Sequence, residues 1–214
     1  MSVLIYRDAQ SVGTCAAVLV ASHLLSDPKC VIGVDYHEVL LPVFETLSDM
    51  TDSGLLNWSD AQIYQLYEFL PAEDGEQRIA NLLGKALFAK TDISEKQYAV
   101  PFSSELTPEE ISATFERSIL NDGGLDVALL AVRQDGALLM NTSVNSEPGT
   151  HREIIDTDGF ITSGLCNRHA SEASDCRCDR KKLFRCGKGD AVRKSNGFAA
   201  CCVTTSSRSD VRTR

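Results

Sequence analysis

Two kinds of apolar pattern alternate along the first 135 residues, and this alternation is what most restricts the possible folds. Short apolar runs typical of strands are separated by stretches in which apolar residues recur every three or four positions. We expect strands at 3–6, 30–34, 61–69, 98–101 and 123–136, and helices at 9–25, 39–47, 75–90 and 107–121. Strand–helix–strand alternation implies right-handed crossovers between parallel strands. The sequence therefore predicts an α/β fold, a Rossmann-like open parallel sheet with helices on both faces.

The helix expected after residue 106 has a well-defined start. Thr107 is a capping residue, Pro108 suits the first helical position, and the side chain of Glu110 can reach back to the amide of the capping residue. The run 121–124, Asn-Asp-Gly-Gly, closes this helix before the next strand.

That next strand carries a candidate site at its end. A nearly unbroken apolar run leads into Asp135 and Gly136, as expected for a buried parallel strand. Ligands of open α/β sheets bind outside the carboxyl ends of such strands. The alternative is that Asp135 and Gly136 form only a tight turn, for which both residue types are favoured.

The order of several such features resembles the glucosamine-6-phosphate deaminase and 6-phosphogluconolactonase family over about residues 1–155. The shared features are an N-terminal strand and long helix, a strand ending at Gly33, a strand ending in Tyr67-Glu68-Phe69, the run Gly123-Gly124-Leu125-Asp126, the Asp135-Gly136 strand end, Asn141, and Ser146-Glu147-Pro148-Gly149. The resemblance implies a sugar phosphate as the small-molecule partner and chemistry that needs no cofactor and no metal.

The resemblance also implies roles for individual residues. Asp135, Glu68 and Glu147 are the expected catalytic residues, which would transfer a proton between C1 and C2 of an amino sugar phosphate before water-assisted release of ammonia. The expected substrate-binding residues are Gly33, His37, Gly136 and Asn141. Without a role in catalysis, the three acids would be solvated loop residues.

The chain departs from the family at three of these places. The family holds the phosphate on a small Gly-rich loop after the second strand, whereas this chain has Asp35, Tyr36, His37 and Glu38 there. Tyr67 stands where the deaminases have the acid that abstracts the substrate proton, and Ala137 stands in place of the histidine that activates ring opening. We therefore expect weak phosphate binding and reduced or lost activity. The alternatives are a 6-phosphogluconolactonase-like hydrolase and a non-catalytic sugar-phosphate-binding or regulatory module.

Charge divides the chain at about residue 160. Residues 1–160 hold 9 Lys and Arg against 25 Asp and Glu, whereas residues 161–214 hold 12 against 5. The overall net charge of −9 argues against nucleic acid as a partner. No signal peptide or apolar stretch of about 20 residues is apparent, so a cytoplasmic protein without a membrane partner is expected. The oligomeric state is left open, and a homo-oligomer is compatible with the sequence.

The tail from 161 to 214 is poor in large apolar residues and rich in Arg, Ser and Cys. Such a composition predicts a segment without a packed core, because little apolar burial is available to offset the entropy of ordering. We expect the sheet to be incomplete at the C-terminus and the tail to be disordered or read out of frame. The alternative is a genuine basic tail that binds zinc and touches nucleic acid, suggested only by the irregularly spaced residues Cys166, His169, Cys176, Cys178 and Cys186.

Overall fold

A computed structural model describes residues 2–69, 78–133, 160–162, 182–186 and 200–205. Strands alternate with helices, as the sequence predicts. The strands are β1 (Ser2–Tyr6), β2 (Val31–Val34), β3 (Gln62–Gln65), β4 (Tyr67–Phe69), β5 (Tyr98–Ala99), β6 (Val127–Ala131), β7 (Phe160–Thr162), β8 (Lys182–Cys186) and β9 (Ala200–Thr205). The α-helices are α1 (Ala9–Ser26), α2 (Leu41–Asp52), α3 (Ile79–Ala86) and α4 (Pro108–Asn121), and the short 3₁₀ helices are η1 (Glu38–Leu40), η2 (Phe88–Lys90) and η3 (Glu95–Gln97).

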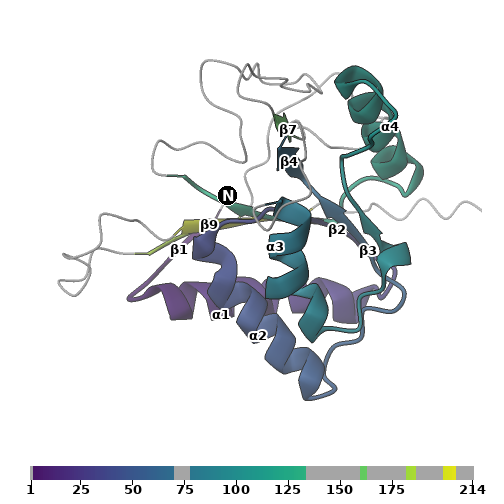
Figure 1. Ribbon diagram of the computed structural model, residues 1–214. Helices are drawn as coiled ribbons and strands as arrows, with labels where there is room; N and C mark the ends of the chain where they lie inside the picture. Colours follow the sequence, from purple (N-terminus) through teal and green to yellow (C-terminus); the bar gives the residue numbers. More distant parts are fainter. Residues whose placement is uncertain (1, 70–77, 134–159, 163–181, 187–199, 206–214) are drawn as a thin grey trace, which may run out of the picture.

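Seven of the described strands form one sheet in the order β1-β8-β9-β6-β2-β3-β5 (Figure 1). The central strands β6, β2, β3 and β5 run parallel to one another, and β1 runs parallel to β8. β9 is antiparallel to both of its neighbours, β6 and β8. Parallel neighbours joined through helices require crossover connections, so the predicted parallel α/β sheet is confirmed.

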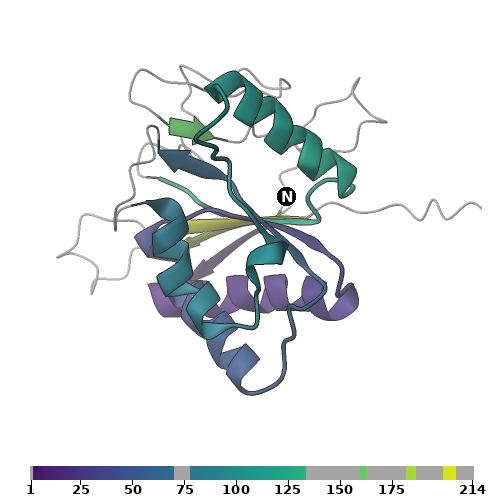
Figure 2. The ribbon, with the colours of Figure 1, turned by 45° about the vertical axis from the view of Figure 1, so that its right-hand side comes forward.

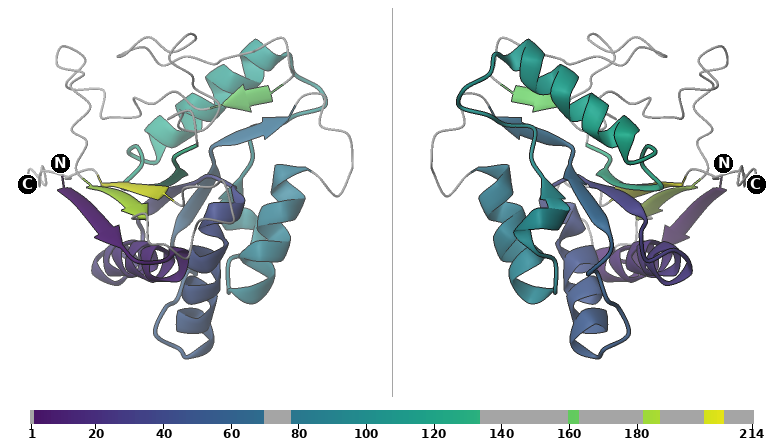
Figure 3. Two further views of the ribbon diagram at one scale, coloured as in Figure 1. Left: turned by 90° about the vertical axis from the view of Figure 1, so that its left-hand side faces the viewer. Right: turned by 90° about the vertical axis from the view of Figure 1, so that its right-hand side faces the viewer.

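Helices cover both faces of this sheet. α1, α2 and α3 lie on one face and α4 lies on the other, which is clearest when the molecule is turned (Figures 2 and 3). Every residue of β2 and β6 is buried, as expected for central strands of a sheet covered on both sides. The predicted apolar face of this helix is confirmed. Its four apolar residues are all buried, namely Leu40 just before α2 and Val43, Phe44 and Leu47 within it.

The two long helices of one face meet at a glycine. A Cβ atom added at Gly13 of α1 would lie 2.6 Å from the Cβ of Pro42 and 2.9 Å from its carbonyl carbon in α2. α1 is long and apolar enough to cross a membrane by length and composition alone. Its buried residues include Val12, Ala16 and Val20, which belong to the hydrophobic core. Packing in the core therefore accounts for part of the apolar character of α1, whereas Val18 and Leu25 of the same helix are exposed.

The predicted cap of α4 is confirmed. The Thr107 hydroxyl accepts a bond from the Glu110 amide at 3.3 Å, and the Glu110 carboxylate accepts one from the Thr107 amide at 2.9 Å. Beyond the helix, Gly123 and Gly124 have φ angles of 93° and 85°. These left-handed conformations strain residues that have a Cβ, so the two glycines allow the turn into β6.

The expected single strand over 61–69 is wrong in one respect, because it breaks at Leu66. β3 stays in the large sheet, whereas β4 leaves it and pairs with β7 in a separate two-stranded sheet. The expected helix over 75–90 is also shorter in the described residues, where α3 ends at Ala86 and η2 follows at 88–90. The helix over 39–47 begins as η1 and continues through α2 to Asp52.

Two segments of the tail take part in the sheet. β8 and β9 lie between β1 and β6, with Ser2 opposite Lys182 and Val127 opposite Thr205. The rest of 163–214 lies outside the described residues, so the absence of a packed core in the tail stays a prediction. The proposed division of the chain at residue 160 also stays a prediction.

Candidate active site

Three buried or half-buried polar side chains follow neighbouring parallel strands at the same edge of the sheet. Asp35 comes directly after β2, Tyr67 comes two residues after β3, and Arg133 comes two residues after β6. β2 pairs with both β3 and β6, so these three strand ends are adjacent. The carboxyl edge of a parallel sheet is where open α/β folds bind ligands.

Asp35 is fully buried at this edge. Its Oδ2 accepts a hydrogen bond from the amide of Ala131, the last residue of β6, at 2.9 Å. Its Oδ1 is buried without a hydrogen-bond partner. Burial raises the pKa of the Asp35 carboxyl to about 7, against the opposing effects of the Ala131 amide and the charge of Arg133. Asp35 is therefore able to exchange a proton near neutral pH.

Tyr67 connects the loop after β2 to β4. Its hydroxyl donates a 2.7 Å bond to the carbonyl oxygen of Tyr36. The guanidinium carbon of Arg133 lies 6.0 Å from the centre of the Tyr67 ring. Burial and the nearby charge of Asp35 raise the pKa of Tyr67, so this phenol stays protonated at neutral pH. A buried phenol in this state acts as a hydrogen-bond donor rather than as a base.

His37 has a structural task in addition to its predicted contact with substrate. Its Nδ1 accepts a bond from the Val39 amide at 3.3 Å, which caps η1. Partial burial and the charge of Arg133 lower the pKa of the half-buried imidazole, although Glu38 opposes this effect. His37 is therefore uncharged at neutral pH and adds no positive charge to the loop.

Glu68 lies beside this cluster, and its carboxylate holds the start of α3. It accepts bonds from the amides of Ile79 at 3.0 Å and Ala80 at 3.2 Å, the first two residues of that helix. Further donors are the Phe69 amide, the Gln65 amide nitrogen Nε2 and the Arg78 guanidinium, at 3.0, 3.0 and 3.4 Å. A carboxylate at a helix N-terminus satisfies amides that lack partners within the helix. The sequence predicted proton transfer for Glu68 and did not include this structural role.

The other predicted site residues have different outcomes. Gly33 lies within β2, and a Cβ there would lie 2.9 Å from side-chain atoms of both Leu66 and Leu125, so its lack of a side chain permits close packing. Asp135, Gly136, Asn141 and Glu147 lie outside the described residues. Their roles, like those of Gly33, His37 and Glu68, stay predictions.

The three residues of this edge, Asp35, Tyr67 and Arg133, were not among the sequence-predicted catalytic or binding residues. The sequence contained one indication for Asp35, because this acid directly follows four apolar or small strand residues. Arg133 had a similar one, a cation after the apolar run of β6. In the part of the chain that the structure describes, no group of three or more His, Cys, Asp and Glu side chains could hold a metal ion.

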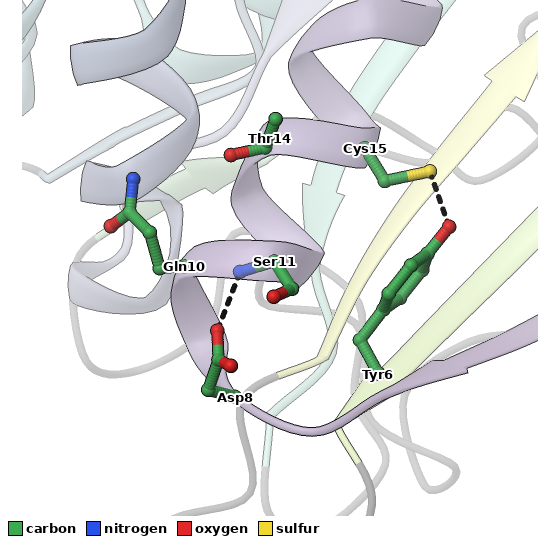
Figure 4. Close-up of a pocket in the computed structure, with 6 residues that line it drawn as sticks. All are labelled: Tyr6, Asp8, Gln10, Ser11, Thr14 and Cys15. Carbon is green, nitrogen blue, oxygen red and sulfur yellow. Dashed lines mark hydrogen bonds between the residues drawn. The ribbon is translucent and has the colours of Figure 1, made fainter.

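A pocket lies away from these three residues, between the end of β1 and the first turns of α1 (Figure 4). There the Tyr6 hydroxyl donates to the Cys15 sulfur at 2.9 Å, and Asp8 caps α1 by accepting from the Ser11 amide at 2.7 Å. Gln10 and Thr14 complete the lining. None of the sequence-predicted site residues lies there.

No family model matches the chain, but the curated proteins similar to it include several glucosamine-6-phosphate deaminases. It is 26% identical over 151 residues to a glucosamine-6-phosphate deaminase of Bacillus pumilus and 28% identical over 148 residues to one of Streptomyces coelicolor. These matches cover 70% and 68% of this chain and 61% and 56% of the two relatives. The predicted family resemblance is confirmed. The chain spans about three fifths of the length of these two glucosamine-6-phosphate deaminases.

Two solved structures, a glucosamine-6-phosphate deaminase and a 6-phosphogluconolactonase, have the same fold as this chain. A monomeric glucosamine-6-phosphate deaminase superposes with a TM-score of 0.70 at 15% identity, covering 77% of this chain and 76% of that structure. The 6-phosphogluconolactonase of Thermotoga maritima superposes with a TM-score of 0.60 at 18% identity, covering 76% of each chain. A longer but weaker similarity, 23% identity over 220 residues, covers 94% of this chain and 81% of a glucosamine-6-phosphate deaminase of Shewanella loihica.

Proposed function

We propose that the chain carries out, or descends from proteins that carried out, the deamination and isomerisation of an amino sugar phosphate. The observation that carries this proposal is the similarity to glucosamine-6-phosphate deaminases over about 150 residues. That similarity is joined by a cluster of proton-exchanging and charged groups at the carboxyl edge of the sheet, where the fold binds ligands. We propose that the activity is reduced or lost, because Tyr67 and Ala137 stand where the deaminases have an acid and a histidine.

In the proposed reaction a proton moves from C2 to C1 of the opened sugar while the carbonyl character moves from C1 to C2. Water then adds at C2 and ammonia leaves, which gives a ketose phosphate. Asp135 and Glu147 are our proposed proton-transfer groups. We propose Glu68 as a positioning residue, because its carboxylate is engaged by the α3 amides and by Arg78. A well-placed acid or base contributes about 100- to 10,000-fold to such a step.

Two alternatives remain as second candidates. A lactonase would use the same strand ends to activate water, and the fold shared with the Thermotoga maritima 6-phosphogluconolactonase supports it. A non-catalytic sugar-phosphate-binding module is supported by Tyr67, whose protonated phenol stands where the deaminases have an acid. We further propose a cytoplasmic location.

The experiment is an assay of purified full-length protein with glucosamine 6-phosphate and with 6-phosphogluconolactone. Ammonia release that falls at least about 100-fold in Asp135→Asn supports the deaminase. Asp52→Asn is the control, because it removes the same charge at the exposed far end of α2. Lactone hydrolysis without ammonia release would instead support the lactonase. Saturable binding without turnover of either compound would support the non-catalytic module.

A further inference from the structure

A buried glutamine lies where the chain leaves the large sheet. Gln65 is the last residue of β3, and its side chain is fully buried. Its amide nitrogen Nε2 donates to the carbonyl oxygen of Tyr67 at 2.8 Å and to the carboxylate of Glu68 at 3.0 Å. An amide NH₂ group has two hydrogen atoms to donate. Gln65 therefore uses both of them on Tyr67 of the candidate site and on its neighbour Glu68.

The oxygen of the same amide has a partner on another strand. Gln65 Oε1 accepts a hydrogen bond from the hydroxyl of Tyr98 on β5. Burial and the nearby charge of Glu68 raise the pKa of the Tyr98 phenol, so it stays protonated and donates. A flipped Gln65 amide would turn its oxygen toward a carbonyl and a carboxylate, which only accept hydrogen bonds. All three partners therefore require the same orientation of the amide.

Tyr98 also contacts the far end of the helix that Glu68 holds. Its ring packs against that of Phe88 in η2, just after α3, with ring centroids 4.2 Å apart. At the other end, the Glu68 carboxylate accepts from the amides of Ile79 and Ala80. The position of Glu68 therefore depends on residues of β3 and β5 as well as on α3.

A buried polar network of this kind holds its members in place only while each of them has its partners. A buried polar atom without a partner carries the full cost of its lost hydration. Loss of the Tyr98 hydroxyl would leave Gln65 Oε1 in that state. A displacement of the Gln65 amide would in turn release the Tyr67 carbonyl and one bond of Glu68.

We propose that Gln65 and Tyr98 are positioning residues of the candidate active site. Gln65 holds Tyr67 and Glu68 at β4, and Tyr98 fixes the Gln65 amide in the orientation that this requires. The inference rests on the proposed function, in which the reaction takes place at this edge of the sheet and Glu68 is itself a positioning residue. Gln65 and Tyr98 act through their partners and need no contact with the substrate.

The first test is whether a change at Tyr98 reaches the start of α3. Tyr98→Phe removes the hydroxyl and keeps the ring. Hydrogen exchange of the Phe69, Ile79 and Ala80 amides, which donate to Glu68, is measured by NMR. We expect exchange at these amides to become at least about tenfold faster. Unchanged exchange at all three would overturn the proposal.

Tyr64→Phe is the matched control for this measurement. It removes a tyrosine hydroxyl from the neighbouring residue of β3, where the bond is to Asp122 instead of Gln65. We expect the exchange of the Phe69, Ile79 and Ala80 amides to stay within about threefold of that in the wild type.

The second test is at the site itself. Gln65→Glu keeps the shape of the side chain, but the ionised carboxylate would face Glu68 and would leave the Tyr67 carbonyl without its donor. We expect kcat for ammonia release from glucosamine 6-phosphate to fall about 100-fold at pH 9, with KM changed less than about threefold. At pH 6 the introduced carboxyl group is protonated and can donate to Glu68, so the loss of kcat should be at least about tenfold smaller.

Gln62→Glu is the matched control, because it makes the same change at the half-buried first residue of β3, and it should keep the wild-type kcat. A folded Gln65→Glu protein, checked by circular dichroism, with wild-type kcat at both pH values would refute the proposal. If Gln65→Glu does not fold, kcat and amide exchange of Tyr98→Phe decide. A wild-type protein that releases no ammonia would contradict the proposed function, and amide exchange then decides whether Tyr98 and Gln65 hold Glu68.

Discussion

Asp35 shows how one buried acid couples the edge of the sheet to pH. Its pKa is about 7 in the folded chain, compared with 3.8 for an ordinary aspartate. Between these values the folded chain holds a proton that the unfolded chain has lost, so stability falls as pH rises from about 4 to about 7. The raised pKa corresponds to a loss of up to about 4 kcal/mol in the free energy of unfolding between pH 4 and pH 7.

Asp35→Asn tests this linkage, because the amide stays neutral at every pH. We expect the free energy of unfolding of the wild type to fall more steeply between pH 5 and pH 7.5 than that of Asp35→Asn, measured by urea denaturation. Asp52→Asn, at an exposed position, is expected to keep the wild-type slope. Equal slopes for wild type and Asp35→Asn would show that Asp35 titrates normally.

Glu68→Gln separates a structural role from a catalytic one. A glutamine offers one acceptor oxygen and an NH₂ group, so the amides of Phe69, Ile79 and Ala80 cannot all stay bonded. We expect a loss of roughly 3 kcal/mol in unfolding free energy and faster hydrogen exchange in α3. Glu45→Gln, exposed on α2, is the control and is expected to change stability by less than about 0.5 kcal/mol. A fully stable but inactive Glu68→Gln protein would instead favour direct participation in proton transfer.

Some hydrogen bonds of these residues could be predicted from the sequence, and others could not. The cap at Thr107 could be predicted because its partner, Glu110, lies three residues away. The partner of Asp35 is the amide of Ala131, which only the pairing of β2 with β6 brings near. The role of Glu68 likewise depends on where α3 begins. Local bonds are readable from the sequence, whereas bonds made by tertiary packing are not.

At the scale of elements, apolar periodicity located most helices and strands but not the break at Leu66. The run from 61 to 69 is apolar enough for one strand. The break at Leu66 follows Gln65, whose buried side chain donates to the Tyr67 carbonyl and to Glu68 at 2.8 and 3.0 Å. These bonds accompany the departure of β4 from the large sheet. Periodicity measures burial, and both halves are largely buried, so the pattern carries no sign of the change of sheet.

The contact between α1 and α2 yields a prediction about two glycines. Gly13→Ala should gain up to about 1 kcal/mol in helix propensity, but its methyl group would meet the backbone of Pro42. We expect a net destabilisation of about 1–3 kcal/mol, because the two helices must move apart. Gly84→Ala in α3 is the matched comparison, since nothing lies within 4 Å of its added Cβ, and it should stabilise by about 0.5–1 kcal/mol. Measured melting temperatures that shift in the same direction for both variants would contradict this account.

For the whole molecule, the abrupt change near residue 160 to a sequence rich in Arg, Ser and Cys still predicts a change of reading frame near that codon. Two observations weigh against this prediction. β8 and β9 pair within the sheet, and the similarity to the Shewanella loihica relative covers 94% of the chain. The measurement is the nucleotide sequence. A frame change predicts that another frame downstream of codon 160 encodes alternating strand and helix patterns. Absence of such patterns in both other frames would contradict the prediction and favour a genuine basic tail.

The pairing of β1 with β8 has a consequence for the order in which the sheet is built. Ser2 lies opposite Lys182, so β1 waits for a partner strand that is synthesised about 180 residues later. At about 5–20 residues per second, this wait lasts roughly 10–40 s. During that time the backbone N–H and C=O groups of β1 lack the neighbour they have in the finished sheet, and unpaired strand edges associate with other chains. Yield of folded protein should therefore depend on the concentration of nascent chains and on how fast the ribosome moves.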